Sequence, residues 1–106
     1  MPKYLVQASY VGQGLKGLLK EGGSSRRAAV EKMFESVGAR VESFYYAFGD
    51  TDLYIIADAP DNITVAGLSL TVNATGAATT KVTVLLTAEE IDAAAKKTPS
   101  YRPPGQ

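Results

Sequence analysis

Polar and aromatic side chains recur at every second position in several stretches that are rich in β-branched and aromatic residues. Alternate residues of a strand point to the same face of its sheet, so these side chains are predicted to converge on one face. A lysine and an aspartate there could transfer protons if burial shifted their pKa values, and tyrosines could orient a ligand. The predicted ligand-binding cluster comprises Gln7, Ser9, Tyr46, Tyr54, Asp58, Lys81 and Thr83.

Two interpretations of this cluster stay open. It is either a small polar pocket, in which Asp58 and Lys81 serve as acid and base, or a dimer interface in which an Asp–Lys pair and tyrosine hydroxyls satisfy one another. The interface is favoured, because ligand pockets are few per protein. The phase of the second strand is undecided, since the adjacent Tyr45 and Tyr46 point to opposite faces and either could join the cluster.

Two further groups of residues can be interpreted either as local structural features or as ligand-binding sites. Asp52 follows a hairpin turn, where an aspartate usually accepts bonds from backbone N–H groups, and ligand binding is the alternative. Arg26 and Arg27 follow a GGSS loop at a helix start, which could hold an anion. A capped helix with solvated arginines is favoured, and the loop lacks the P-loop lysine pattern of nucleotide hydrolysis.

Composition excludes several classes of chemistry. The chain has no cysteine and no histidine, which rules out disulfides, thiolate nucleophiles, Ser-His-Asp triads and histidine-ligated metals or haem. The acidic residues show no calcium-loop spacing, so we expect no metal and no cofactor. Eleven basic and eleven acidic residues give zero net charge, which disfavours nucleic-acid binding and is compatible with self-association.

Hydropathy indicates no membrane association. No stretch approaches the roughly 18 apolar residues of a membrane span. The first residues lack the charged-then-apolar pattern of a signal peptide, because strand-like sequence begins by Lys3. A cytoplasmic location is therefore expected.

Hydrophobic periodicity predicts the elements that position the cluster. Strands are predicted over residues 3–11, 40–48, 53–57 and 79–86, with a hairpin turn at 49–52. Helices are predicted after an N-cap at Ser24 or Ser25 as far as Gly38, from Asp61 or Asn62 to about Ala74, and after Thr87, where Glu90 completes a capping box. Glycines 12, 14 and 17 predict a flexible or short helical turn, rather than a long helix, before the first of these helices. Residues 98–106 are predicted to lie extended on a surface of the same chain or of a partner.

The order of these elements predicts a single α+β domain over residues 1–106. It is the ferredoxin-like βαββαβ arrangement with an added C-terminal helix, in which two helices cover one face of an antiparallel sheet. The uncovered face would expose apolar side chains, so a partner is expected there. A second copy related by two-fold symmetry is the simplest partner, and we expect a homodimer or a higher homo-oligomer.

The chain resembles the GYD domain family over nearly its whole length, from YLVQASY through RRAAVEKMFESVGARVESFYYAFG and DLYIIADAPDN to YRPPG. The family is named for a Gly-Tyr-Asp element at the hairpin turn. Gly49 and Asp52 match this element, while Thr51 stands where the family commonly has an aromatic residue. The resemblance implies a dimeric α+β barrel in which two sheets pack face to face, and it implies no activity. Related barrel families include cofactor-free monooxygenases, haem enzymes and muconolactone-isomerase-like proteins.

Two functional hypotheses follow. The favoured one is a small dimer that binds a small ligand or a partner without a metal or haem. The alternative is a cofactor-independent, monooxygenase-like or isomerase-like enzyme that acts on a small aromatic or reactive metabolite in the barrel cavity. In that enzyme, Tyr54, Asp58 and Lys81 would position or deprotonate the substrate.

Overall fold

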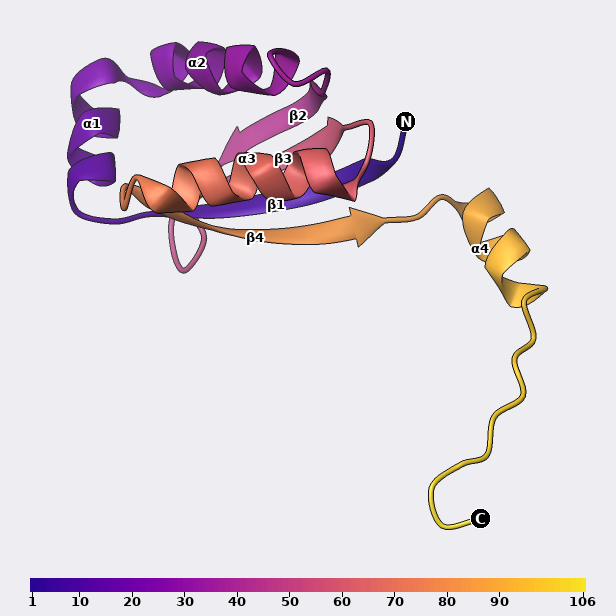
Figure 1. The fold of residues 1–106 in the computed structure, drawn as a ribbon. Coiled ribbons are helices and arrows are strands. Elements are labelled where there is room, and N and C mark those ends of the chain that lie inside the picture. The colour runs from indigo at the N-terminus through magenta and orange to yellow at the C-terminus, as the bar shows by residue number, and fades with distance from the viewer.

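The computed structural model describes all residues 1–106 and has the predicted order of strands with one additional helix (Figure 1). The elements are β1 (Lys3–Tyr10), α1 (Gln13–Glu21), α2 (Gly23–Glu35), β2 (Arg40–Tyr46), β3 (Leu53–Asp58), α3 (Asn62–Ala74), β4 (Ala78–Leu85) and α4 (Ala88–Ala95). None of these helices combines the length and the apolar character that crossing a membrane requires.

The four strands form one antiparallel sheet in the order β2-β3-β1-β4. Strand β1 lies between β3 and β4, and Gln7 of β1 is paired with Tyr54 on one side and Lys81 on the other. This order, with α2 and α3 packed on one face, confirms the ferredoxin-like α+β fold.

The hydrophobic core lies between the sheet and the helices α2 and α3. Strand residues at alternate positions point into it, as the sequence pattern predicts. Its buried members include Tyr4, Val6, Ala8, Phe44, Leu53, Ile55 and Ala57 from the sheet and Val30, Phe34, Val65 and Leu68 from the helices. The Tyr4 hydroxyl donates a 2.6 Å hydrogen bond to Asn62 Oδ1, so the one large polar side chain in this core is satisfied.

The segment before α2 differs from the prediction. Instead of a short turn, residues 13–21 form the nine-residue helix α1, and α2 begins without the predicted serine cap. Gly22 stands between the two helices with φ of 84°, a conformation that glycine adopts without steric strain. The sharp change of direction therefore occurs at Gly22, and Ser24 and Ser25 fall inside the first turn of α2.

The helix starts predicted at Asp61 and Thr87 are confirmed, whereas α2 ends at Glu35, short of the predicted Gly38. Asp61 caps α3 by accepting a hydrogen bond from the Thr64 N–H, and Thr87 and Glu90 form the complete capping box of α4. Gly38 has φ of 78° after α2. The Ala39 N–H returns to the Phe34 carbonyl, as in a Schellman motif.

The C-terminal arm, residues 86–106, extends away from the sheet and the helices (Figure 1). Every residue of the arm is exposed. The radius of gyration is consequently 17.0 Å, compared with about 13 Å for a compact chain of this length. The predicted tail is extended, but it does not lie on the surface of its own chain.

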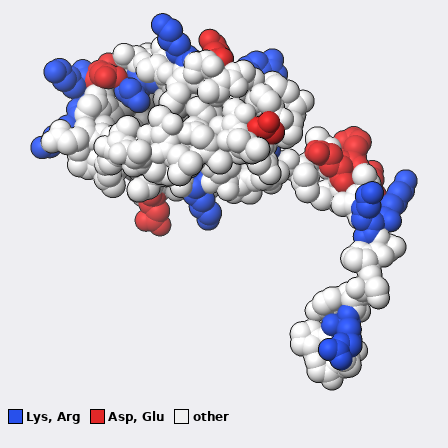
Figure 2. All heavy atoms as spheres, in the orientation of Figure 1, with Lys and Arg blue, Asp and Glu red and all other residues white.

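Charged side chains are sparse over α3, which has no charged residue (Figure 2). Acidic side chains of α4 and basic side chains beyond it follow one another along the arm. The exposed apolar side chains Ile63 and Leu70 lie on α3. The outer side of α3 is therefore a weakly charged surface.

Candidate functional site

The uncovered face of the sheet brings together most of the predicted cluster. Gln7, Tyr54 and Lys81 lie side by side on three neighbouring strands. Thr83 lies opposite Leu5, and the Ser9 hydroxyl donates a 2.8 Å bond to the Asp50 carbonyl. The residues of the cluster that share this face are Gln7, Ser9, Tyr54, Asp58, Lys81 and Thr83.

Tyr46 does not share this face, and its assignment to the cluster was wrong. Its hydroxyl donates a 2.9 Å bond to the Gly23 carbonyl, and its ring packs edge-on against Phe44 on the helix-covered side. Burial raises the pKa of Tyr46 above its ordinary value. Tyr45 takes the place on the uncovered face, opposite Tyr54.

Asp58 belongs to an ion-pair cluster at the far end of this face. Its carboxylate accepts bonds from Lys3 Nζ at 2.9 Å and from the Arg40 guanidinium at 3.0 Å, and Lys3 also donates to Glu42 at 2.7 Å. The bonds from Lys3 and then Arg40 hold the pKa of Asp58 below its ordinary value. Asp58 is therefore ionised and fully paired, and it is poorly suited to act as a base.

Lys81 is not the partner of Asp58, contrary to the predicted Asp–Lys pair. In the strand register, Lys81 stands opposite Gln7 of β1, whereas Asp58 stands opposite Lys3, which is four residues away along β1. Four strand residues span roughly 13 Å, which is beyond hydrogen-bond reach. The acid and base of the enzyme hypothesis are thus separated.

The pairing of Asp58 predicts a specific loss of stability in acid. A carboxyl whose pKa is lowered on folding stabilises the fold above its unfolded-state pKa, near 3.9, and this contribution is lost as the pH falls through the folded-state pKa. We expect Asp58→Asn to lower the free energy of unfolding by about 1.5 kcal/mol at pH 7, because a charge-assisted bond is lost.

Urea unfolding of the wild type and of Asp58→Asn between pH 7 and pH 3 checks this prediction. The difference between the two proteins should shrink as the pH falls below about 4. A difference that stays constant over the whole range would show that the carboxylate charge contributes nothing.

A half-open cavity of about 300 Å³ lies on the other face of the sheet, between α2 and α3. Its floor is formed by side chains of β1 and β3, and its walls come from α2, α3 and the start of β4. The lining residues are Val6, Ala8, Tyr10, Arg26, Ala29, Val30, Met33, Phe34, Leu53, Ile55, Thr71, Val72, Thr75, Ala77, Ala78 and Thr80. We call this space the inter-helix cavity.

The inter-helix cavity is largely apolar, since 12 of its 16 lining residues are hydrophobic. Its threonines are already bonded within the chain: Thr71 donates to the Gly67 carbonyl and Thr75 to the Val72 carbonyl, while Thr80 pairs with Ser69. The polar lining groups left for a ligand are chiefly Tyr10 and Arg26.

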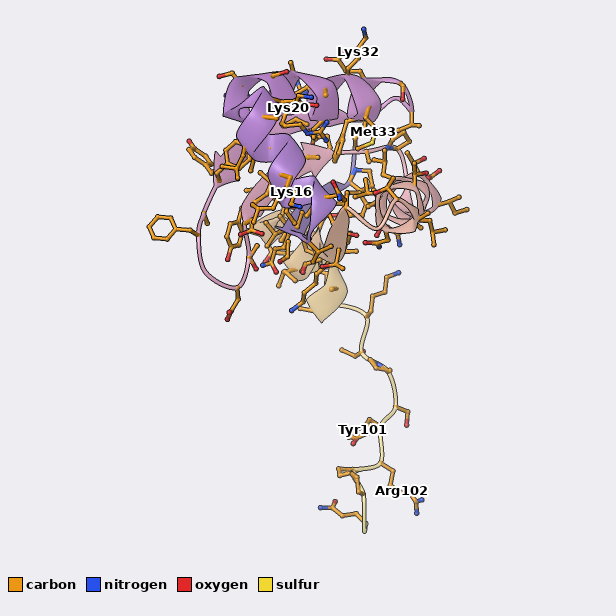
Figure 3. The ribbon with its side chains drawn as sticks, turned by 90° about the vertical axis from the view of Figure 1, so that its left-hand side faces the viewer. Lys16, Lys20, Lys32, Met33, Tyr101 and Arg102 are labelled. Atoms are coloured by element: carbon orange, nitrogen blue, oxygen red, sulfur yellow. The ribbon has the colours of Figure 1, made fainter.

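Met33 lies between the inter-helix cavity and a more open groove beside it. It projects from α2 towards α3 and lines both the inter-helix cavity and the groove that runs past Ile63 (Figure 3). The unbranched thioether side chain is adaptable in shape. The cavity can therefore accept occupants of somewhat different outline.

Sequence reasoning missed the cavity, although one signal was present. Small residues line the space between the sheet and the helices, namely Ala8, Ala29, Ala77 and Ala78. Small side chains leave space where helices pack on a sheet, but only the spacing of α2 and α3 decides whether that space stays open.

No group of three or more histidine, cysteine, aspartate or glutamate side chains lies close enough together to hold a metal ion. A family model, described as the GYD domain, matches residues 4–95. The chain belongs to the GYD domain family. Comparisons with curated proteins and with solved structures give no match.

The hairpin element of the GYD domain has a clear structural role in this chain. Gly49 has φ of 139°, which favours glycine. The Asp52 carboxylate accepts a 2.8 Å bond from the Tyr10 N–H, and the Asp52 N–H donates to the Ala8 carbonyl. The Asp52 carboxylate therefore accepts a backbone N–H bond, as predicted for an aspartate that follows a hairpin turn. This bond connects the hairpin loop to the end of β1.

Proposed function

We propose that this GYD domain protein is a homodimer that binds a small, largely apolar molecule in the inter-helix cavity, without a metal or haem. The observation that supports binding is the cavity of about 300 Å³ with an apolar lining. This volume is at the lower end of the range of small-molecule pockets, about 300–1,000 Å³. A smaller engineered cavity, of about 150 Å³, already binds benzene.

Binding is favoured over catalysis by the arrangement of the ionisable groups. The proposed acid and base, Asp58 and Lys81, lie on the opposite face of the sheet from the cavity, and Asp58 is held in ion pairs. The cavity has no carboxylate in its lining. A ligand in the cavity would therefore not contact the acid and the base that general acid–base catalysis requires.

The uncovered sheet face supports the homodimer. Its centre carries Leu5 and Ile56 directly opposite each other, with Tyr45 and Tyr54 on the adjacent pair. No helix packs on these side chains, and Tyr45 and Tyr54 are exposed. An exposed apolar patch of this kind marks an interaction surface, and a two-fold dimer is the commonest way in which a chain covers one.

The surface area of the chain is consistent with a missing partner. The chain exposes 7411 Å², whereas a compact monomer of 11.2 kDa exposes about 5,700 Å². The excess is roughly twice the area of about 800 Å² that each partner buries in a standard interface. Every residue of the C-terminal arm is exposed, so this excess reflects the arm and favours a partner that covers it.

The C-terminal arm is proposed to pack against the second copy. Helix α4 has only eight residues and buries none of them. An isolated helix of this length is marginal in water, even with a complete capping box. Its exposed Ile91 and the preceding Leu86 offer an apolar contact, so packing on a partner would supply the missing stabilisation.

Filling the cavity tests the proposed binding. Ala29 lines the cavity from α2, whereas Ala28, also exposed on α2, does not. We expect Ala29→Phe to weaken the binding of N-phenyl-1-naphthylamine, a neutral apolar fluorophore, at least tenfold, or about 1.4 kcal/mol. Ala28→Phe should bind as the wild type does.

A fluorescence titration of the three proteins measures this difference. Unchanged binding in both variants would place the probe elsewhere on the chain, and equal weakening by both would show that filling the cavity is not the cause. Absence of saturable binding to the wild type would contradict the proposed function itself.

A further inference from the structure

The charge in the inter-helix cavity has a single sign. Arg26 is the one charged residue in the lining, and no aspartate or glutamate accompanies it. The chain as a whole has equal numbers of acidic and basic residues, so this local imbalance does not follow from composition. An occupant of the cavity would therefore meet an apolar surface with one positive group.

Arg26 is only loosely paired within the chain. Its guanidinium lies 3.7 Å from the Glu21 carboxylate, beyond ordinary hydrogen-bond distance. Arg40, by comparison, donates to Asp58 at 3.0 Å. The Arg26 side chain is 34 % exposed, so it is partly withdrawn from water. An anion that reached it from the cavity could gain a charge-assisted hydrogen bond that Glu21 does not supply.

We propose that the ligand of the inter-helix cavity is a compact apolar monocarboxylate whose carboxylate pairs with Arg26. This inference rests on the proposed function, since it names the class of molecule that the same cavity binds. One arginine matches one negative charge, and its planar donors fit a carboxylate. The hydrocarbon part would lie over Val6 and Ile55 on the floor.

The volume of the cavity limits the size of the hydrocarbon part. A cavity of about 150 Å³ holds one benzene ring. The inter-helix cavity, at about 300 Å³, therefore holds about two rings or an alkyl chain of similar bulk, and a third ring can extend through its open side. Because the cavity is half open, the polar end of such a molecule can face Arg26.

Calorimetric titration with 2-naphthoate and with its neutral isostere, 2-naphthamide, tests the inference. The wild type should bind 2-naphthoate at least tenfold more tightly than 2-naphthamide. Arg26→Met should remove this preference and keep the affinity for 2-naphthamide, which also shows that the variant is folded. Arg27→Met is the matched control, because Arg27 stacks over Phe44 and does not line the cavity.

The outcomes separate the two proposals. If the wild type binds both compounds equally, the cavity binds apolar molecules but the inferred anion site is wrong. If Arg26→Met keeps the preference for 2-naphthoate, or Arg27→Met loses it, the carboxylate is not bound by Arg26. If neither compound binds the wild type, the monocarboxylate inference fails. If the wild type also shows no saturable binding of N-phenyl-1-naphthylamine, the proposed function itself is wrong.

Discussion

Ile56→Asp is expected to convert the proposed homodimer to a monomer, with at least a hundredfold weaker self-association. Ile56 lies at the centre of the uncovered sheet face, opposite Leu5. Two-fold symmetry would bring the new carboxylates of both copies into the same interface, where they lack partners. Burying unpaired charges is strongly unfavourable, and central interface positions carry most of the association energy, about 2–4 kcal/mol at a hot spot.

Sedimentation velocity over a range of protein concentrations measures this change, and Leu70→Asp provides the control. Leu70 is 71 % exposed on α3, so its replacement also removes an exposed apolar side chain and adds a charge. The control should remain a dimer. If Leu70→Asp dissociates the protein and Ile56→Asp does not, the interface lies on α3. A wild type that is monomeric at all concentrations would refute the dimer.

Gly14→Ala should lower the free energy of unfolding by about 3 kcal/mol, the upper end of the usual cost of an overpacked site. A Cβ atom on Gly14 would lie 1.9 Å from the carbonyl oxygen of Ala77 and 2.7 Å from its carbonyl carbon. Both are backbone atoms, so no side-chain rotation can relieve the clash. The Val11 N–H also donates a 2.9 Å hydrogen bond to the same carbonyl, which limits how far the Ala77 backbone can move away.

Gly17→Ala is the matched control for this prediction, with the opposite sign. Gly17 lies in the same helix, and a Cβ atom there would meet nothing within 4 Å. Alanine is a better helix former than glycine, so this variant should be stabilised by about 0.5–1 kcal/mol. Urea unfolding of the two variants beside the wild type checks both signs. Similar destabilisation by both would indicate that loss of glycine flexibility, rather than contact with Ala77, is the cause.

The sequence by itself determined the order of strands and the face to which most side chains point. Both depend on local physics, because a strand has a period of two and caps such as Asp61 and Thr87 act within one helical turn. The same local reasoning failed at Tyr46, where two adjacent tyrosines left the phase open and a bulge between Val41 and Ser43 interrupts the alternation of β2.

Helix α1 shows where local propensity was overridden. The glycines of this segment predicted a turn, because each one weakens a helix by roughly 1 kcal/mol. The structure has a helix there, and Gly14 supplies the close approach to Ala77 that a larger residue would prevent. Gly14, whose residue type disfavours a helix, is therefore needed for the contact of this helix with the rest of the fold.

Only the tertiary structure decided the partners of Asp58 and the existence of the inter-helix cavity. Lys3, Arg40 and Asp58 are far apart in the chain, and they meet because the registers of β1, β2 and β3 align them. The cavity exists because α2 and α3 are spaced apart over a floor of β1 and β3 side chains. Strand register and helix spacing arise from the packing of the whole domain, so no local pattern of residues specifies them.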